Sequence, residues 1–393
     1  MKQGILTINA GSSSIKFALF PLARPISARA EVHGQIDGIG TAATRMDAYD
    51  KSGERVADQP IPGDKVSHDQ AFDALLKWFL EAYTGWHIIA VGHRVVHGGE
   101  RYSKPTLIDP TVLEHLTGFI PLAPLHQPHN VAGIRALGNL LPNVPQIACF
   151  DTAFHRTQPE VAQLFGLPRS LTAEGIKRYG FHGLSYEYIA RMLPQYSHRA
   201  NGRVVVAHLG NGASMAAMVN RKCVATTLGF STIDGLMMGT RCGALDPGVV
   251  LHLMETKNLS VKDMTRMLYK ESGLLGVSGI SQDMRTLLSS HKPEAQEAVD
   301  LFCYRIVREL GSLCAAAGGI DALVFTGGIG EHAAEVRRRV CMQSEWLGIR
   351  VNPEANARHD IVISAGNSSV DVLVVPTNEE WMMAHHAQTL LGL

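Results

Sequence analysis

The chain has 393 residues, a length that fits about two domains. It is 46% hydrophobic and 18% charged, which allows a large core and argues against extended disorder. Its 36 Lys and Arg balance 36 Asp and Glu, so a general nucleic-acid or anionic-membrane binder is not expected. An anionic ligand would therefore have to be bound by a few Lys or Arg side chains gathered at one site.

No apolar run approaches the roughly 20 residues that span a bilayer, and the N-terminus enters a strand without a signal-peptide pattern. The six cysteines form no CxxC pair, so we expect buried or free thiols and a cytoplasmic protein. His126 and His129 lie in "PLHQPHN" without a local cysteine or acid. Zinc is therefore not expected there.

Strand-like and helical stretches alternate, which predicts an α/β architecture. Strands are expected, in chain order, in "GILTINA", "IKFALF", "IIAVGHRVV", "VPQIACFD", "RVVVAHLG", "DALVFTGG" and "VDVLVVPT". Residues 34–64 are expected to form strands with surface loops. Helices are expected in "HDQAFDALLKWFLEAY", "QEAVDLFCYRIVRELGSLCAAAG" and "EHAAEVRRRVCM".

The first hairpin, "ILTINAGSSSIKF", joins two apolar runs through a glycine and three serines. Asn9 closes the first strand, and Ser12 lies in the turn. Ser14 and Lys16 have the spacing of one strand face. Hydroxyls, backbone N–H groups and one ammonium at a turn predict a site that faces a polyanion.

A second hairpin repeats this pattern in "VVVAHLGNGASMAAMV" at 204–219. Setting Gly11 on Gly210 places Asn9 on His208. A genuine repeat predicts a duplicated domain with a ligand cleft between the halves. The alternative is a chance likeness between two short hairpins.

Two further glycine-rich stretches carry candidate ligand contacts. "FTGGIGEHAAEV" runs from a strand into a helix start, which favours an anionic or hydroxyl-rich ligand. "GVSGISQDMR" is a polar turn that ends in Asp283 and Arg285. Each stretch alone is weak evidence for a ligand site, because glycine-rich loops usually serve backbone geometry. The chain has neither a P-loop nor a complete kinase signature, so a phosphate cradle would be of another kind.

Two arginines stand in unusual surroundings. Arg94 lies in the apolar strand "VGHRVVHGG", and Arg241 lies between glycines in "GLMMGTRCGALDPG". Together they suit a carboxylate and a phosphate, because guanidinium groups match both geometrically. Structural ion pairs are the alternative explanation.

Three other polar side chains are candidates with ordinary structural alternatives. Asp151 ends a strand, where carboxylates commonly point at ligands, although it could equally cap the next helix. His182 in "RYGFHGLS" could be a core histidine. Glu379 and its neighbour in "VVPTNEEW" could simply start a helix.

These stretches together resemble one family, the acetate kinases, within the larger group of acyl-phosphate kinases. The resemblance spans essentially the whole chain through "INAGSSSIKF", "VGHRVVHGGE", "PLAPLHQP", "CFDTAFH", "RYGFHG", "HLGNGAS", "GLMMGTRCG", "LLGVSGISQDMR", "FTGGIGE" and "PTNEE". It implies an α/β fold of duplicated actin/Hsp70/sugar-kinase-like (ribonuclease H-like) domains around a central cleft, and a homodimer. The domains would be 1–150, with the helix 380–393 packed on it, and a nucleotide-binding domain 151–379.

The resemblance also implies site residues and the cofactors ATP/ADP and Mg²⁺, with Mn²⁺ as an alternative metal. The metal would be held by Asn9 and Glu379, and the phosphate end by Ser12, Ser14 and Lys16. The catalytic residues would be Asp151, His182, Arg241 and Arg94. The acyl substrate would contact Arg94, Val96, Leu125, His126 and Phe181. ATP would be held by His208, Leu209, Gly210, Asn211, Gly212, Asp283, Met284, Arg285, Gly328, Ile329, Gly330, Glu331 and His332.

The implied reaction is reversible transfer of the ATP γ-phosphoryl group to acetate. A carboxylate acceptor is already ionised at pH 7 and needs no general base, so we expect Asp151 to orient an arginine or a metal-bound water. The sequence departs from the family pattern at Leu184, Tyr186, Ala225, Thr232, Ala244 and His332.

Three alternatives stay open at this point. The first is a propionate or broader short-chain acyl kinase, whose substrates are longer than acetate. Each added methylene changes the discrimination between substrates by only about 1–3 kcal/mol. A chaperone-like nucleotide-binding protein would bind ATP without acid-dependent turnover. A sugar kinase would act on a hydroxyl, and Asp151 would then be its base.

Overall fold

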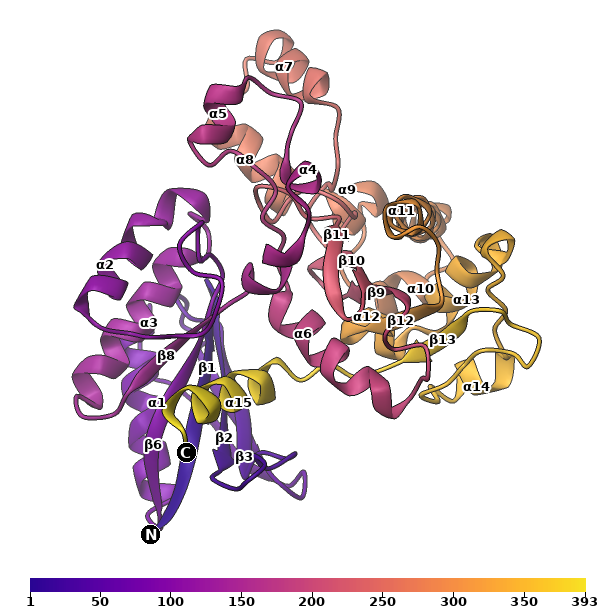
Figure 1. The fold of residues 1–393 in the computed structure, drawn as a ribbon. Coiled ribbons are helices and arrows are strands. Elements are labelled where there is room, and N and C mark those ends of the chain that lie inside the picture. The colour runs from indigo at the N-terminus through magenta and orange to yellow at the C-terminus, as the bar shows by residue number, and fades with distance from the viewer. The chain divides into compact units, whose positions relative to one another are not determined.

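Two α/β units make up the computed structural model, which describes residues 1–393 (Figure 1). The N-terminal unit comprises Met1–Ala153 and Asn378–Leu393, and the C-terminal unit comprises Phe154–Thr377. The model contains no helix with the length and apolar character to cross a membrane.

The N-terminal unit is built on an eight-stranded sheet with the order β5-β4-β3-β2-β1-β6-β8-β7. Its strands are β1 (Lys2–Ala10), β2 (Ser14–Pro21), β3 (Val32–Asp37), β4 (Arg45–Asp50), β5 (Arg55–Pro60), β6 (Trp86–Val95), β7 (Thr106–Leu107) and β8 (Gln146–Phe150). Its helices are α1 (His68–Ala82), α2 (Pro110–Gly118), α3 (Gln127–Leu140) and α15 (Glu379–Leu391), with a 3₁₀ turn at Ile120–Leu122.

Helix α1 begins where the sequence predicts, because Ser67 and Gln70 form a capping box. The Ser67 hydroxyl accepts from the Gln70 N–H at 3.2 Å, and the Gln70 side chain accepts from the Ser67 N–H at 2.8 Å. Its buried side chains, among them Phe72, Leu75 and Phe79, join strands β1 and β2 in one core.

Helix α15 covers the opposite face of this sheet. Val91 of β6 belongs to the core shared with α1, whereas its neighbour Gly92 faces α15. Successive strand residues point to opposite faces, so the two helices cover different sides of the sheet. The C-terminal segment therefore packs on β1 and β6, as Figure 1 shows in yellow.

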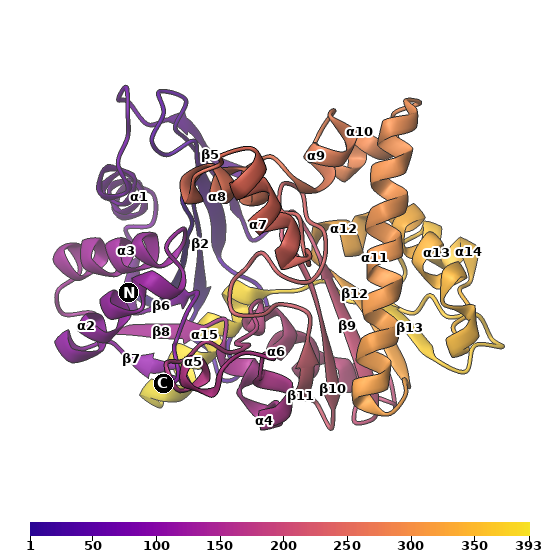
Figure 2. The same ribbon diagram turned by 90° about the horizontal axis from the view of Figure 1, so that it is seen from above.

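The C-terminal unit contains a five-stranded sheet with the order β11-β10-β9-β12-β13. The strands are β9 (Arg203–Leu209), β10 (Ala213–Val219), β11 (Lys222–Thr226), β12 (Ala322–Thr326) and β13 (Asp371–Val374). The helices are α4 (Glu160–Gln163), α5 (Arg169–Ala173), α6 (Gly183–Met192), α7 (Pro247–Thr256), α8 (Val261–Lys270), α9 (Gly273–Ser278), α10 (Met284–Leu288), α11 (Pro293–Ala317), α12 (Gly327–His332), α13 (Ala334–Gln343) and α14 (Pro353–Ala357). Short 3₁₀ turns lie at Ala153–Thr157, Leu193–Gln195 and Glu345–Leu347. Figure 2 shows α11 running beside the strands.

The two sheets confirm the predicted duplication. The order β3-β2-β1-β6-β8 matches β11-β10-β9-β12-β13, with the first three strands antiparallel and the last three parallel in both sheets. The hairpin turns also correspond. Gly11 N–H donates to the Ser14 carbonyl at 2.8 Å, and Gly210 N–H donates to the Gly212 carbonyl at 3.0 Å.

One predicted helix, "EHAAEVRRRVCM", proves to be two helices separated at Ala333. The first, α12, already begins at Gly327, within the glycine-rich turn. Gly327 adopts φ +76°, and its N–H donates to the Glu331 carboxylate at 2.8 Å. Glycine tolerates this backbone, and the carboxylate satisfies an N–H group that a helix start leaves unpaired.

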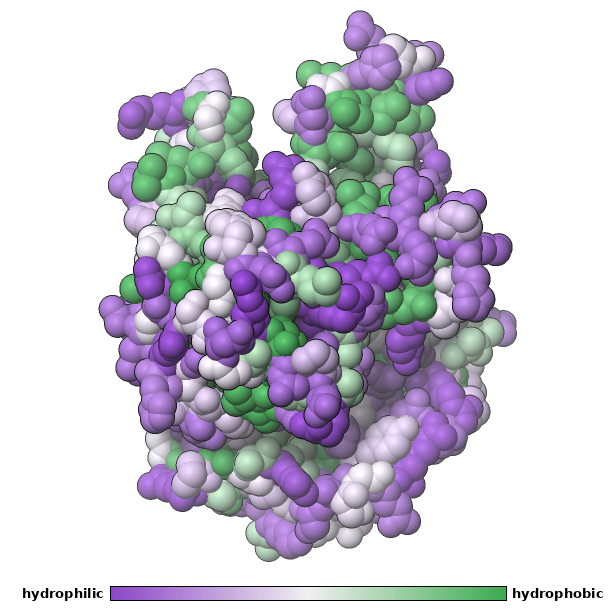
Figure 3. Space-filling view, turned by 90° about the vertical axis from the view of Figure 1, so that its right-hand side faces the viewer, coloured by the Kyte–Doolittle hydropathy of each residue, from purple (hydrophilic) through white to green (hydrophobic).

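Helix α7 has no buried residue, although it is rich in apolar side chains. Val249 and Leu251 are 40% and 67% exposed, and Val161 of α4 is 78% exposed. Figure 3 shows apolar surface beside hydrophilic residues at the top of the molecule, where Figure 1 places α5 and α7.

The contact between Gly92 and α15 generates a stability prediction. A Cβ atom at residue 92 would lie 3.1 Å from the Met383 carbonyl oxygen and 3.2 Å from the Met383 Cβ. We expect Gly92→Leu to lower the free energy of unfolding by about 1–3 kcal/mol, because the packed interface has no room for a side chain. Urea unfolding measures this loss.

Gly85→Ala is the matched control, since a Cβ at residue 85 meets nothing within 4 Å. The control should stay within about 0.5 kcal/mol of the wild type. Equal stability of both variants would contradict the close packing of α15 on β6.

Candidate functional site

Four segments of the N-terminal unit bring a cation and three polar partners together around Arg94 of β6. Arg94 Nε donates to the Asp151 carboxylate at 3.0 and 3.1 Å, and its Nη2 donates to Asp151 Oδ2 at 2.6 Å. Arg94 Nη1 donates to Asn9 Oδ1 at 3.3 Å. Glu379, the first residue of α15, lies 3.7 Å from Arg94 Nε. The structure thus brings together four residues from distant parts of the chain. The first, Asn9, and the last, Glu379, are 370 positions apart.

This group is strongly charged and largely withdrawn from water. The Asp151 side chain is 1% exposed and that of Arg94 21%. Burial alone would lower the pKa of Arg94, but the carboxylates of Asp151 and Glu379 overcome this and hold the pKa above its ordinary value. Burial raises the pKa of Glu379 to about 7, an effect that Arg94 opposes and the Asp151 charge supports.

The oxygen donors of this group fit a hard divalent cation. Asn9 and Glu379 offer an amide and a carboxylate oxygen, the ligand types that Mg²⁺ prefers. Burial raises the pKa of Glu379 most, and the nearby carboxylates of Asp151 and Glu380 add to this; a cation would offset their negative charge. No cluster of three His, Cys, Asp or Glu side chains able to hold a metal is present. Mg²⁺ at this position would keep several water ligands.

The predicted phosphate-facing residues lie on the β1–β2 hairpin of the same unit. Lys16 is exposed and pairs with Asn9 across the two strands, and Ser14 is half-buried on the same face. Ser12 lies exposed in the turn. The His68 ring, Nε2, donates to the Gly11 carbonyl at 2.8 Å, which ties this turn to the start of α1.

The predicted acyl-contacting residues belong to both units. Val96 is buried just after β6, and Leu125 and His126 are half-buried just before α3. Phe181 belongs to the C-terminal unit, is 1% exposed, and its carbonyl accepts from His155 Nε2 at 2.8 Å.

In the C-terminal unit, His182, His208 and Arg241 gather around the β9–β10 turn. The rings of His182 and His208 stack with centroids 4.4 Å apart. A Cβ on Gly212 would lie 3.4 Å from His182 Nε2 and 3.9 Å from Arg241 Nη1, so both nitrogens point to the glycine of the turn. Arg241 Nη1 also donates to the Thr232 carbonyl at 2.9 Å. His182 has φ 59°, a left-handed backbone that costs energy for a residue with a side chain.

Two of the predicted nucleotide-binding segments lie against each other in this unit. A Cβ on Gly327 would meet the Leu209 carbonyl oxygen at 2.8 Å, and Thr326 pairs with His208 between parallel strands. Gly328, Ile329, Gly330, Glu331 and His332 therefore begin directly beside the turn formed by His208, Leu209, Gly210, Asn211 and Gly212.

The third predicted segment, Asp283, Met284 and Arg285, forms the start of α10. The Asp283 carboxylate accepts from the Arg285 N–H at 2.8 Å and from Arg285 Nη2 at 2.7 Å. Met284 is buried, whereas the Arg285 side chain is 89% exposed. The contacts described for this segment tie its residues to one another, and α10 packs on α11.

Sequence reasoning missed the amides that fix the strand ends around Arg94. Asn130 of α3 accepts from the Val96 N–H at 3.0 Å and donates to the Ala10 carbonyl at 2.9 Å. Gln127 bonds both backbone groups of His97 at 3.2 Å. Two amide residues one turn apart in "QPHN" are the only local signal of this function.

It also missed Arg337, which is completely buried in α13. Arg337 Nη1 donates to the carbonyls of Gly330 and Glu331 at 2.8 Å, and its Nε donates to Asn356 at 2.7 Å. Burial lowers the pKa of Arg337 to about 10. This side chain fixes the end of α12, and "VRRRV" alone does not reveal which arginine faces inward.

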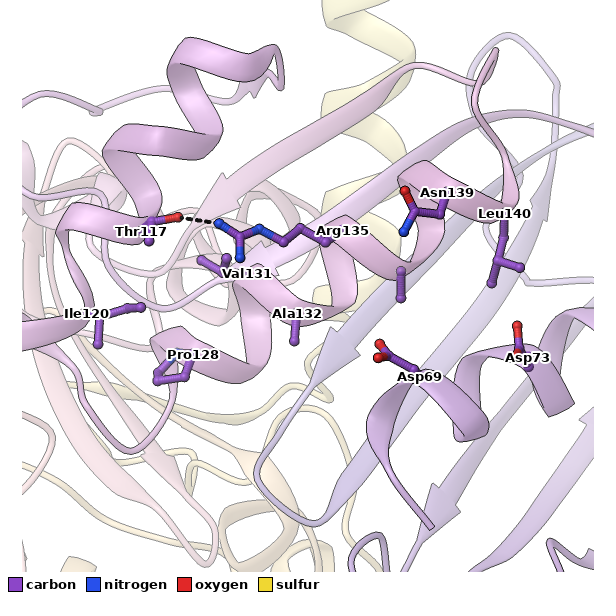
Figure 4. A pocket seen from close by; sticks show the side chains of 11 residues that line it. Asp69, Asp73, Thr117, Ile120, Pro128, Val131, Ala132, Arg135, Asn139 and Leu140 are labelled. Atoms are coloured by element: carbon purple, nitrogen blue, oxygen red, sulfur yellow. Dashed lines mark hydrogen bonds between the residues drawn. The ribbon is translucent and has the colours of Figure 1, made fainter.

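The N-terminal unit also has a groove of about 710 Å³ between α1 and α3, shown in Figure 4. Asp69 and Asp73 line one side and Arg135 and Asn139 the other, and Arg135 bonds the Thr117 hydroxyl at 3.3 Å. None of the predicted site residues lines this groove.

Comparison with known proteins matches the chain over nearly its whole length. The model of the Acetokinase family matches residues 4–385. A protein named acetate kinase from Rhodopseudomonas palustris is 53% identical, covering 99% of each chain. The structure of Porphyromonas gingivalis acetate kinase is 37% identical with a TM-score of 0.87, covering 99% of this chain and 100% of that one. A propionate kinase from Francisella tularensis is 35% identical with a TM-score of 0.91, covering 98% and 99%.

The Arg94–Asp151 pair generates a prediction for the N-terminal unit. Asp151→Asn removes the buried negative charge but keeps a side chain of the same shape. We expect the free energy of unfolding to fall by about 3 kcal/mol, because a buried arginine loses its nearest counter-charge. Chemical denaturation at neutral pH measures the change.

Asp73→Asn, an exposed carboxylate on α1, is the control and should leave stability within about 0.5 kcal/mol. If both variants unfolded at the same denaturant concentration as the wild type, Asp151 would not be the group that holds Arg94.

Proposed function

The chain belongs to the Acetokinase family, and on this premise we propose that it reversibly transfers the γ-phosphoryl group of ATP to acetate, giving acetyl phosphate and ADP. The observation that carries the proposal is Arg94, a half-buried cation near the C-terminal end of β6 that Asp151 holds at 2.6 Å. A fixed guanidinium suits a reaction whose transition state is anionic.

The N-terminal unit would bind and orient the acceptor. Asp151 and Asn9 engage Arg94 through Nε, one N–H of Nη1 and one of Nη2. Each terminal nitrogen therefore retains an N–H for the acyl carboxylate or the phosphoryl group. Val96 and Leu125 of this unit would supply apolar contacts expected of a small acyl pocket.

The C-terminal unit would bind the nucleotide and offset the charge of the transferred group. Arg241 and His182 direct nitrogens toward Gly212, in the turn that corresponds to the serine-rich turn of the first hairpin. Backbone N–H groups of this turn and of the start of α12 would serve the phosphates. Ser12, Ser14 and Lys16 would serve the phosphate end from the other unit.

Asn9 and Glu379 would hold Mg²⁺, which when bound supplies positive charge to the phosphate oxygens. The acetate carboxylate is ionised at neutral pH, so its oxygen forms the new bond to phosphorus directly as the bond to ADP breaks. A base is not needed for this step. Asp151 accordingly acts as the group that orients Arg94, and the direct hydrogen bonds between them support this role.

A propionate or broader short-chain acyl kinase is the second candidate. A structure named as a propionate kinase is among the most similar ones, and residue 232 is threonine where the family resemblance leads one to expect proline. The Thr232 carbonyl holds Arg241, so a change here touches the site itself.

All six cysteines are free and five are buried, in keeping with reaction in the cytoplasm.

We further propose that the protein is a homodimer formed through α7 of the C-terminal unit. Val249 and Leu251 are exposed there although they are large and apolar. A helix such as α7 gains little stability from its own unit, since none of its residues is buried. A second copy would cover this surface, and balanced net charge removes long-range repulsion between copies.

Trapping of acyl phosphate with hydroxylamine tests the reaction. Protein, ATP and Mg²⁺ are incubated with acetate, propionate or butyrate in turn, and we expect the hydroxamate with acetate as the best acceptor. Arg241→Lys should lose about 10²–10³ in kcat, because an ammonium cannot reproduce the guanidinium contacts. Arg135→Lys, in the groove of the N-terminal unit, is the matched control and should keep wild-type turnover.

A higher kcat/KM with propionate or butyrate than with acetate would favour the second candidate, a propionate or broader short-chain acyl kinase. Binding of ATP without any hydroxamate would contradict both acyl-kinase proposals and favour a nucleotide-binding protein without this chemistry. Sugar-dependent consumption of ATP would instead support a hydroxyl acceptor.

Sedimentation velocity tests the dimer. We expect the wild type to sediment as a dimer and Leu251→Asp as a monomer, because a carboxylate would be buried in the apolar interface. Leu80→Asp in α1, where the leucine is 64% exposed, is the matched control and should remain dimeric. A monomeric wild type, or a dimeric Leu251→Asp variant, would argue against this surface.

A further inference from the structure

A chain of hydrogen bonds leads from His182 into the core of the C-terminal unit. His182 Nδ1 lies 2.8 Å from Ser214 Oγ, and Ser214 Oγ lies 2.5 Å from Tyr186 Oη. Ser214 belongs to β10 and Tyr186 to α6, the helix that begins one residue after His182. The chain therefore joins a strand and a helix behind the imidazole.

Both members behind the histidine are completely buried. Ser214 and Tyr186 have 0% exposure, whereas His182 is half-buried. A hydroxyl removed from water must find partners within the protein, so the direction of each hydrogen bond is set by the neighbouring groups. The neighbouring His208 has a serine as well, Ser185 at 2.8 Å from its Nδ1.

The other ring nitrogen of His182, Nε2, determines which direction of these hydrogen bonds would serve a ligand. Nε2 points toward Gly212 and lies on the side of Arg241 Nη1. To serve an anionic ligand there, Nε2 must carry a proton, and in a neutral ring Nδ1 must then accept. Ser214 would donate its only proton to Nδ1, and its oxygen would accept from Tyr186.

We propose that Tyr186 is a positioning residue that, through Ser214, holds His182 in the tautomer with hydrogen on Nε2. The inference rests on the proposed function only in assigning His182 to the phosphoryl group. A phenol hydroxyl donates to Ser214, Ser214 donates to Nδ1, and Nε2–H is directed toward the ligand.

Packing alone does not account for the hydroxyl of Tyr186. Its ring contacts Phe154 and His155 at centroid distances of 6.0 and 5.5 Å, and it belongs to the core of the unit. A phenylalanine would preserve these ring contacts. The tyrosine oxygen adds a buried polar atom, and it lies 2.5 Å from Ser214 Oγ.

Tyr186→Phe removes this oxygen and leaves the ring. We expect kcat for acyl phosphate formation to fall about tenfold, the effect of losing one orienting hydrogen bond, with KM for ATP within about twofold. Tyr188→Phe removes the same atom from a half-buried tyrosine of the same helix. This control should retain wild-type kcat, and thermal unfolding of both variants checks that they fold.

Nitrogen-15 spectra of histidine-labelled protein read the tautomer directly, with the His182 signals assigned by their loss in His182→Gln. We expect an unprotonated Nδ1 in the wild type and in Tyr188→Phe, and a mixed population in Tyr186→Phe. A protonated Nδ1 in the wild type would overturn the proposal, whether or not any variant folds.

Ser214→Ala supplies the second test. Because Tyr186 acts through Ser214, adding Tyr186→Phe to Ser214→Ala should cost less than twofold further in kcat. A full tenfold further loss would show that the tyrosine acts by another route and would overturn the proposal. If the wild type formed no acyl phosphate but the His182 tautomer still changed in Tyr186→Phe, the proposed function would be refuted. The role of Tyr186 in holding the tautomer would then stand.

Discussion

The buried ion pair between Arg94 and Asp151 is the constraint on which the N-terminal unit depends. A guanidinium 21% exposed beside a carboxylate 1% exposed is stable only if both charges are matched and hydrogen-bonded. This requires the ends of β6 and β8 to lie side by side, which the parallel register of Arg94 with Cys149 provides. It also explains the buried amides of α3, since Asn130 and Gln127 hold the backbone just beyond β6, and Asn130 also bonds the last residue of β1.

The duplicated architecture presents different side chains on the same arrangement of strands. In the first hairpin, Asn9 and Lys16 face each other across β1 and β2, next to a carboxylate cluster. In the second, His208 and Ser214 occupy the paired positions across β9 and β10. This exchange gives the two hairpins different polar side chains at corresponding strand positions. The identical strand order shows that the exchange did not require a change of fold.

Much of this organisation could be predicted from the sequence, because its signals are local. Alternating apolar strands, the spacing of Ser14 and Lys16, and the likeness of the two hairpins each depend on neighbouring residues. The contacts of Ser214, Asn130 and Arg337 could not be predicted in this way. Each bonds groups that are brought close only by the packing of separate elements, such as Asn130 with Ala10, which is 120 positions away. The early start of α12 has a local cause that the glycine-rich pattern did not reveal, since the Glu331 side chain folds back to accept from the Gly327 N–H.

Glu331 joins two backbone segments of the C-terminal unit that are far apart in sequence. Its carboxylate accepts from the Gly327 N–H at 2.8 Å and from the Thr377 N–H at 3.2 Å. Thr377 is the last residue of the C-terminal unit, and only Asn378 separates it from Glu379. Asn378 is itself fixed, because its side chain accepts from the Trp381 N–H at 2.8 Å and caps α15. One carboxylate, that of Glu331, therefore fixes both the backbone at the start of α12 and the last residue of the C-terminal unit.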